Sequence, residues 1–290
     1  MDEKIIDGKK IAADIKKELR AEIEALEKSN ITPGLAVIVV GSDPASAVYV
    51  RNKKKAALDL GIYSEVFELE EDTKEEKLLA LIDKLNKDGK IHGILVQLPL
   101  PKHISEERII LAISPQKDVD CFHPKNVGKV ITGGAKVFPC TPAGIIELLK
   151  RSDIEISGRN CVVIGRSNIV GKPMALMMLE NSATVTICHS KTNNLASHTK
   201  EADIIIAAVG KAKMVTADMI KEGAVIIDVG INRMPDGKLA GDVDFDGVLE
   251  KVSAITPVPG GVGPMTIAIL MKNTINIAKN YENRNPKVID

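Results

Sequence analysis

The 290-residue chain contains no tryptophan and few other aromatic residues. With four Phe and three Tyr, its core has to be built from aliphatic side chains. Proteins that bind single-stranded nucleic acid stack bases on aromatic rings, so this scarcity argues against such a partner. Lysine plus arginine and aspartate plus glutamate each number 39, so the chain also lacks the basic excess of nucleic-acid-binding proteins. We expect no nucleic-acid partner.

The four cysteines are too scattered to form a metal or disulfide motif. None is in C-x-x-C spacing, and Cys161 and Cys188 lie in apolar runs, where a thiol acts as a small hydrophobic group. No stretch approaches the roughly 18 apolar residues of a membrane-spanning helix. The start, MDEKIIDGKK, is charged where a signal peptide has an apolar segment. We expect no metal, no membrane association and a cytoplasmic location.

The first half of the chain alternates short apolar runs with amphipathic segments. The pattern predicts strands at 35–41, 63–70 and 91–101 and helices at 44–61 and 73–89. Asp43 is the expected N-cap of the first helix. Thr73 and Glu76 form a capping-box pattern at the start of the second helix. Strands that alternate with helices in this way indicate a mostly parallel sheet.

An irregular segment, 113–140, precedes a second alternating series. Connections of this length are usually functional or join domains. The second series predicts strands at 160–165, 184–188, 203–209, 224–229 and 252–256 and helices at 142–151, 171–181, 193–200, 216–221 and 264–280. A chain of this length usually forms two domains. We therefore predict a two-domain α/β fold.

The stretch GRSNIVGKP, residues 165–173, follows a predicted strand and precedes a predicted helix. This is the place of the glycine-rich loop in dinucleotide-binding folds. Gly165 suits the tight turn, Gly171 suits close helix packing, and Pro173 suits a first helical turn. Free N–H groups of that turn are expected to face the pyrophosphate. The full G-x-G-x-x-G is absent, so an ordinary strand–loop–helix connection is the alternative.

The end of the next strand indicates which dinucleotide binds. An NAD site usually has Asp or Glu about 20 residues after the loop. Here TVTICHSKT places His189, Ser190 and Lys191 at that position. A hydroxyl and cations accept a 2′-phosphate that a carboxylate would repel, and Arg166 can hold a phosphate through two parallel hydrogen bonds. We expect NADP, with Arg166, Ser167 and Ser190 at the phosphate.

Four polar residues in the first half are expected to meet at one edge of the sheet. Tyr49 and Lys53 are four residues apart, hence on one face of a helix that follows a buried strand. Gln97 ends another strand, and Asp120 lies in the irregular segment after it. Ligands of open α/β sheets collect at the carboxyl ends of the strands. Singly, each residue is explained as a helix-surface, capping or turn residue; their convergence favours a site.

These stretches together carry a family resemblance. The motifs are PASAVYVRNKKKAA, GILVQLPLP, KDVD, PCTPAGIIELL, GRSNIVGKP, TVTICHSKT, VIIDVGIN, GDVDF and ITPVPGGVGPMT. They resemble the bifunctional methylenetetrahydrofolate dehydrogenase/methenyltetrahydrofolate cyclohydrolase family over nearly the whole chain. The resemblance implies a cytosolic homodimer of one-carbon metabolism. It also implies a catalytic, folate-binding domain at 1–139, completed by the last helix at 264–290. An NADP-binding Rossmann domain is implied at 140–263, with the active-site cleft between the two.

The resemblance assigns roles residue by residue. Tyr49, Lys53, Gln97 and Asp120 match the catalytic and folate-binding positions. Gly165, Arg166, Ser167, Ser190 and Ile231 match NADP contacts, and the loop Pro259, Gly260, Gly261, Val262 and Gly263 matches the loop beside the substrate. One departure concerns Cys121, because the family usually has glycine there. A side chain beside Asp120 would tighten the pterin pocket or shift its loop.

The implied chemistry has two steps. A hydride passes from the methylene carbon of tetrahydrofolate to the nicotinamide, and water then opens the methenyl product to 10-formyltetrahydrofolate. Lys53 is the candidate acid/base for the second step, and Gln97 is its neutral partner. Tyr49 is expected to orient the substrate or the lysine, and Asp120 to accept two hydrogen bonds from the pterin.

Two other functions fit the same fold: a dehydrogenase without the hydrolytic activity, and a non-catalytic NADP-binding protein. The presence of Lys53 and Gln97 argues against the first, and intact motifs in both halves argue against the second. The sequence leaves open the ratio of the two rates, the direction of flux, the polyglutamate preference and the position of a dimer interface.

Overall fold

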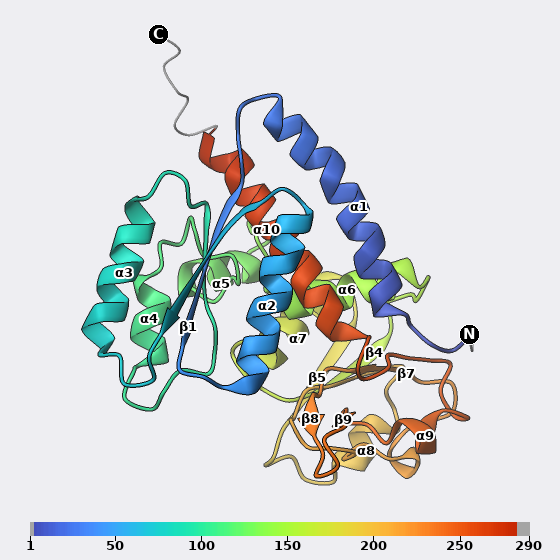
Figure 1. Cartoon of the computed structure of the whole chain (residues 1–290). Helices are drawn as coiled ribbons and strands as arrows, with labels where there is room; N and C mark the ends of the chain where they lie inside the picture. The colour runs from blue at the N-terminus through green and yellow to red at the C-terminus, as the bar shows by residue number, and fades with distance from the viewer. Residues whose placement is uncertain (1–2, 283–290) are drawn as a thin grey trace. The chain divides into compact units, whose positions relative to one another are not determined.

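The structure, a computed structural model, describes residues 3–282 and consists of two compact units (Figure 1). One unit contains Asp14–Cys140 with the segment from Ile267 onward, and the other contains Thr141–Thr266 with the segment up to Ala13. The first residues therefore do not follow the predicted division at residue 139. They leave the first unit because Ile6 N–H donates to the carbonyl of Ile255 at 2.9 Å, which adds this segment to a strand of the second unit.

The unit around Asp14–Cys140, here called the Lys53 unit, has a three-stranded parallel sheet in the order β2-β1-β3. Its strands are β1 (Gly34–Val40), β2 (Tyr63–Leu69) and β3 (Gly93–Val96). Its helices are α1 (Gly8–Glu27, from Asp14 on), α2 (Pro44–Asp59), α3 (Glu75–Lys87), α4 (Glu106–Ala112), α5 (Pro124–Ile131) and α10 (Val262–Glu282, from Ile267 on). The predicted strands and the helices after β1 and β2 are confirmed.

Helices cover both faces of this sheet. One face of β1, with Ala36, Ile38 and Val40, packs on α3 and α4 and forms a core with Ile82 and Ile109. In Figure 1, α3 and α4 lie on one side of β1, and α2 and α10 lie on the other. Strands buried on both faces explain the continuous apolar run of β1, all of which is buried.

The predicted capping box at Thr73 and Glu76 is wrong. Helix α3 begins two residues after Thr73 and has no side-chain cap. Glu75 lies there almost buried, and its carboxylate accepts a hydrogen bond from Ser105 N–H at 2.6 Å and pairs with Arg108. The start of α3 is therefore set by contacts with the segment around α4 rather than by a local cap.

Three helices of this unit, α1, α4 and α5, were not predicted. The irregular segment 113–140 contains α5, whose first turn is capped by His123 Nδ1, which accepts from Lys125 N–H at 3.1 Å. Helix α1 carries Ile15, Leu19 and Ile23 on one buried face. Their spacing of four residues is the amphipathic signal from which α1 could have been predicted.

The second unit, here called the Arg166 unit, has a five-stranded parallel sheet in the order β10-β7-β6-β4-β5. Its elements are α6 (Cys140–Arg151), β4 (Asn160–Ile164), α7 (Gly171–Glu180), β5 (Thr184–Cys188), α8 (Leu195–Thr199), β6 (Ile204–Ala207), η1 (Ala217–Met219), β7 (Val225–Asp228), β8 (Asn232–Arg233), β9 (Leu239–Ala240), α9 (Phe245–Val248) and β10 (Ala254–Ile255). The predicted strands are confirmed, whereas the predicted helix 216–221 is a short 3₁₀ turn.

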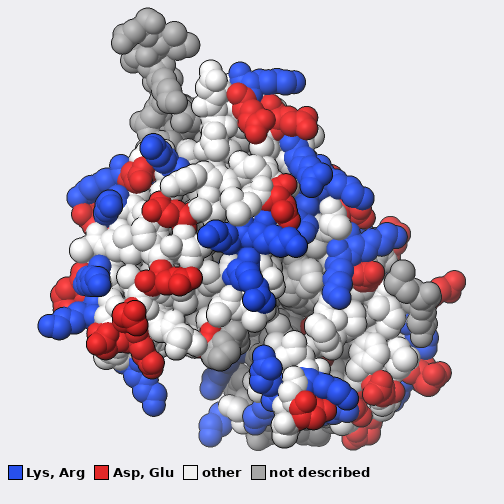
Figure 2. All heavy atoms as spheres, in the orientation of Figure 1, with Lys and Arg blue, Asp and Glu red and all other residues white. Residues whose placement is uncertain are grey.

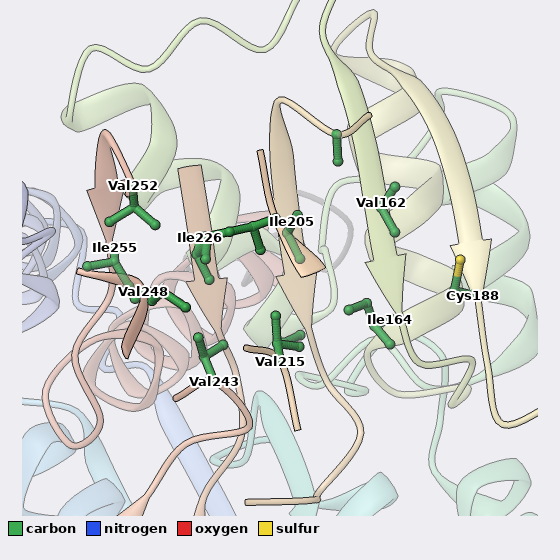
Figure 3. Packing of buried hydrophobic residues seen from close by; sticks show 13 residues of the cluster. Val162, Ile164, Cys188, Ile205, Val215, Ile226, Val243, Val248, Val252 and Ile255 are labelled. Carbon is green, nitrogen blue, oxygen red and sulfur yellow. The ribbon is translucent and has the colours of Figure 1, made fainter. Parts of the chain in front are cut away.

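An aliphatic core fills one face of this sheet. Figure 3 shows Val162, Ile205 and Ile226 on neighbouring strands, with Val215 and Val243 packed against them. Cys188 belongs to the same core and is fully buried, in line with its prediction as a small hydrophobic residue. Because the five strands are parallel, their carboxyl ends share one edge of the sheet, where a ligand is expected.

Charges of both signs are spread over the face of the molecule in Figure 2, as expected for equal numbers of acidic and basic residues. Within residues 3–282, no helix combines the length and the apolar character needed to cross a membrane.

Candidate functional site

Helix α2 presents Lys53 at the edge of the sheet in its unit. Asp43 caps the helix as predicted, because its carboxylate accepts a hydrogen bond from Ser46 N–H at 2.7 Å. Lys53 lies ten residues further on and is buried, with 7% of its surface exposed. Tyr49 is half-buried on the same face of the helix, and burial raises the pKa of its hydroxyl. A buried lysine needs a polar partner.

Gln97 is that partner. Its backbone N–H donates to the carbonyl of Ile38 at 2.8 Å, which continues the β3 pairing by one residue. Its side-chain N–H donates to the Leu98 carbonyl at 2.7 Å, and this bond fixes the orientation of the amide. The amide oxygen therefore faces Lys53 and accepts from Nζ at 2.9 Å. The predicted meeting of Lys53 and Gln97 is confirmed.

Asp120 lies within electrostatic reach of Lys53. Burial raises the pKa of the Asp120 carboxyl group above its usual range. The positive charge of Lys53 and a hydrogen bond from the Cys140 thiol oppose this rise. The structure thus brings Lys53, Gln97 and Asp120 into one polar cluster, with Tyr49 on the same helix face as Lys53.

The backbone that carries Asp120 is held by residues that were not predicted. Asp118 accepts from His123 N–H and from the side chain of Asn126, both at 2.9 Å. Asn273 of α10 donates to the carbonyls of Val119 and Phe138, both at 2.8 Å. Because Asn273 binds backbone of distant segments, its role carries no local sequence signal, and the pattern of the chain did not reveal it.

Cys121, where the family resemblance leads us to expect glycine, is fully buried next to Asp120. Its φ of 59° lies in the left-handed region, which favours glycine. Its thiol donates to the carbonyl of Val137 at 3.3 Å. The loop therefore keeps a conformation suited to glycine while it holds a side chain, and the sulfur adds a contact to the segment before Cys140.

In the Arg166 unit, the loop between β4 and α7 is closely folded around its two glycines. Gly165 has a φ of 132°, and a Cβ there would collide with the carbonyl oxygen of Ala208. A Cβ on Gly171 would collide with the carbonyl of Gly165. Both glycines are therefore required by close approach of the backbone, as predicted from their places in the loop.

The outer part of this loop offers backbone donors. Among the described residues, no acceptor faces the N–H groups from Arg166 to Ile169. The Ser167 hydroxyl accepts from Val170 N–H and Gly171 N–H, both at 3.2 Å, so these first helical donors are satisfied within the loop. The predicted donors for an anion thus come from the loop before α7 rather than from the first turn itself. Backbone N–H groups without an acceptor in the protein, just before a helix, are available to an anionic ligand.

The end of β5 lies beside this loop. Gly165 N–H donates to the carbonyl of Cys188 at 2.8 Å, so Arg166 and Ser190 follow paired positions on neighbouring strands. The turn after β5 is closed by Thr192, whose hydroxyl accepts from His189 N–H at 2.8 Å. Arg166 and Ser190 are both exposed. A cation and a hydroxyl with no acidic residue in either turn suit a phosphate group.

Two further predicted stretches belong to the same unit. Ile231 follows β7 and is 47% exposed. The stretch Pro259–Gly263 follows β10 and runs into the start of α10, and Gly261 N–H donates to the carbonyl of Pro257 at 2.8 Å. A Cβ on Gly261 would lie 2.7 Å from that same oxygen. This loop therefore also depends on glycine for its close turn.

Other candidate sites in the described chain are less well equipped. A cavity of about 210 Å³ in the Lys53 unit is lined by Lys125, Lys129 and Lys136, but by none of the four predicted residues. Residues 3–282 contain no group of three or more His, Cys, Asp or Glu side chains arranged for a metal ion.

Comparison with known proteins finds two family domains along the chain. Residues 6–120 match the family described as "Tetrahydrofolate dehydrogenase/cyclohydrolase, catalytic domain", and residues 139–282 match its "NAD(P)-binding domain". The chain is 59% identical over 279 residues to "Bifunctional protein FolD" of Acetivibrio thermocellus, covering 96% of this chain and 98% of that protein.

Two solved structures are similar throughout. The bifunctional enzyme from Campylobacter jejuni has a TM-score of 0.93 and 51% identity, covering 96% of this chain and 99% of that one. The enzyme from Trypanosoma brucei, solved with NADP and an inhibitor, has a TM-score of 0.92 and 39% identity, covering 96% and 97%. The chain therefore belongs to the bifunctional tetrahydrofolate dehydrogenase/cyclohydrolase family.

Proposed function

We propose that this protein oxidises 5,10-methylenetetrahydrofolate with NADP and hydrolyses the 5,10-methenyl product to 10-formyltetrahydrofolate. Family membership supports both activities. The observation that carries the proposal for this chain is the hydrogen bond between buried Lys53 and the amide oxygen of Gln97. It equips the Lys53 unit with a proton-transfer group next to the acidic side chain of Asp120.

The Lys53 unit, completed by α10, binds the folate in this proposal. Asp120 accepts hydrogen bonds from the pterin ring, and Tyr49 orients the substrate. The bonds that Asn273 and Asp118 make to the surrounding backbone hold Asp120 in place. Preorganised contacts of this kind lower the entropy cost of bringing the reacting atoms together.

The Arg166 unit binds NADP. The unpaired N–H groups of the loop after β4 face the pyrophosphate, and Gly165 and Gly171 allow the backbone to approach it. Arg166, Ser167 and Ser190 bind the 2′-phosphate, for which the exposed guanidinium and the lack of an acid after β5 are the support. Ile231 packs on the cofactor, and Pro259, Gly260, Gly261, Val262 and Gly263 border the substrate. When bound, NADP supplies the acceptor for the hydride of the methylene carbon.

Hydrolysis depends on Lys53. Water adds to the methenyl carbon, the bond from that carbon to N5 breaks, and N5 gains a proton while the added oxygen becomes the formyl oxygen. The net reaction releases one proton. Lys53 accepts a proton from the attacking water and returns one to N5. Gln97 holds the amine in place, because its own amide is fixed by the hydrogen bond to the Leu98 carbonyl. Since an amide is neutral, Gln97 adds no negative charge next to Lys53.

The proposal includes a homodimer in the cytoplasm. Both follow from the family resemblance, and light scattering of the purified protein tests the first.

An assay of the wild-type protein with separate substrates tests the function. Methylenetetrahydrofolate with NADP should give NADPH, and NAD should serve less well. Methenyltetrahydrofolate given to the enzyme without NADP should lose its absorbance faster than in an enzyme-free control. If NADPH forms but hydrolysis is not accelerated, the protein is a dehydrogenase without the hydrolytic activity. If neither reaction is catalysed, a non-catalytic NADP-binding protein is the remaining function.

A further inference from the structure

Two carboxylates lie buried in the Arg166 unit, outside the residues assigned above. Asp228 is the last residue of β7 and is 3% exposed. Asp242 follows β9 and is fully buried. Buried acids are costly to maintain, so their contacts need an explanation.

Asp242 binds the loops that follow two strands. One carboxylate oxygen accepts from the N–H groups of Val209 and Gly210, at 2.6 and 2.9 Å. The other accepts from Lys211 N–H and from the side chain of Asn232, both at 2.9 Å. The loop after β6 and the hairpin after β7 are thus tied to a single side chain.

Asp228 in turn holds Asp242. Its carboxylate accepts from the N–H groups of Asp242 at 2.8 Å, Val243 at 3.0 Å and Gly230 at 3.0 Å. Its own N–H donates to the Thr256 hydroxyl at 2.8 Å. Val243 belongs to the hydrophobic core shown in Figure 3. The pair is therefore anchored to the core on one side and to the loops on the other.

The space around the pair is filled. A Cβ on Gly230 would collide with the carboxylate of Asp242, and a Cβ on Gly241 would collide with that of Asp228. Burial raises the pKa of Asp228 to about 6, although its three N–H donors oppose the rise. The charge of Asp242 is a smaller contribution to the same rise. A buried acid whose pKa is raised next to a second buried acid is an arrangement that concentrates at functional sites.

The contacts converge on Ile231. Its preceding residue, Gly230, is bound by Asp228, and its following residue, Asn232, is bound by Asp242. Ile231 itself is 47% exposed at the carboxyl edge of the sheet. The backbone is thus fixed on both sides of an apolar side chain that faces solvent.

We infer that Asp228 and Asp242 are positioning residues for the dinucleotide, which hold Ile231 and the loop 208–211 in the conformation that binds NADP. The inference rests on the proposed function of the Arg166 unit. It assigns neither acid to the chemistry: both act through the backbone that they bind.

Asp242→Asn tests the inference, because every contact of the Asp242 carboxylate is to a donor. An amide can accept at one of its two positions only, and its NH₂ group would face N–H donors. Loss of a hydrogen bond to a charged group changes the equilibrium constant that depends on it by roughly tenfold or more. We expect the dissociation constant of NADP, measured by calorimetry, to rise at least about tenfold. Hydrolysis of methenyltetrahydrofolate, a reaction without NADP, should stay within about twofold of wild type. Asp246→Asn, at an exposed acid on α9, is the matched control and should change neither value.

Asn232→Ala is the milder variant if Asp242→Asn fails to fold, because it removes one donor and leaves the three backbone donors to Asp242. It should raise the KM of NADP several-fold and leave kcat at saturating NADP nearly unchanged. An unchanged affinity for NADP in either folded variant would overturn the inference, and so would a parallel loss of hydrolysis. Failure of the wild-type protein to bind NADP would instead overturn the proposed function, and the inference with it.

Discussion

Replacement of Lys53 by glutamine should separate the two reactions. Lys53 is buried and donates to the Gln97 amide oxygen at 2.9 Å. Glutamine is slightly shorter, keeps an N–H donor for that oxygen and lacks a titratable amine. The change therefore removes proton transfer and preserves much of the polar packing around α2.

The expected sizes of the two effects differ. Oxidation moves a hydride and needs no proton from a side chain. It should therefore be slowed only by the weakening of the hydrogen bond from residue 53 to Gln97, worth about 0.5–1.5 kcal/mol or roughly two- to tenfold in rate. Hydrolysis loses its acid/base, a contribution of roughly 10²- to 10⁴-fold. We expect dehydrogenase activity to fall by about tenfold at most and cyclohydrolase activity by at least about a hundredfold. The methenyl intermediate should accumulate.

The two rates are measured separately, from NADPH formation and from the decay of methenyl absorbance. Lys54→Gln is the matched control, because Lys54 is the exposed neighbour on the same helix and should affect neither rate. Lys53→Met leaves the Gln97 oxygen without its donor and should lower the oxidation rate more than Lys53→Gln does. Near-normal hydrolysis by Lys53→Gln would show that Lys53 is an ordinary residue of the helix and that the mechanism is wrong.

Four other outcomes are expected. Arg166→Ala should weaken NADP binding by at least about tenfold, through loss of a charged hydrogen bond, and NAD binding much less; equal losses in calorimetry would contradict a 2′-phosphate site there. Asp120→Ala should raise the KM for folate or abolish both activities with the dissociation constant of NADP unchanged; an insensitive folate site would mean that Asp120 does not bind the pterin. Cys121→Gly should be more stable to unfolding than Cys121→Ala by about 1 kcal/mol, measured by denaturant unfolding, because residue 121 has a φ of 59°; the reverse order of stability would exclude backbone strain at this residue. The pKa of Asp228 is raised from 3.8 to about 6, so its contribution to stability is complete below pH 3.8 and is lost as the pH rises through 6. The stability of wild type relative to Asp228→Asn, measured as the difference between their unfolding midpoints, should accordingly decrease as the pH is raised from 4 to 7. An increase over this range would contradict the raised pKa of Asp228.

Much of the fold could be predicted because its signals are local. Buried parallel strands such as β1 read as continuous apolar runs, and Asp43 caps α2 through a residue three positions away. The contact of Lys53 with Gln97 also followed from the pattern, since Gln97 directly follows β3 and Lys53 lies on the helix that follows the neighbouring parallel strand β1.

The errors arose where distant contacts override local pattern. Thr73 and Glu76 have the right spacing for a cap, yet Glu75 instead binds the segment around α4, and α3 begins there. Helix α5 has a Gly in its middle and few apolar residues, so its propensity alone did not reveal it.

The residues that support the site were hidden for a related reason. Asn273 acts on backbone more than 130 positions away in the sequence, and Asp242 binds an N–H group 33 residues before it. Such bonds depend on the tertiary structure and leave no periodicity, spacing or motif for a sequence reading to detect.

The most direct test of the account is a balance of products from one reaction of the wild-type protein. Methylenetetrahydrofolate and limiting NADP are mixed with enzyme, and NADPH, methenyltetrahydrofolate and 10-formyltetrahydrofolate are quantified over time. If the protein catalyses both steps, NADPH should exceed the methenyl compound from early times, with 10-formyltetrahydrofolate making up the difference faster than in a mixture from which enzyme has been removed. NADPH and methenyltetrahydrofolate that rise together, with the formyl product formed only at the enzyme-free rate, would contradict it.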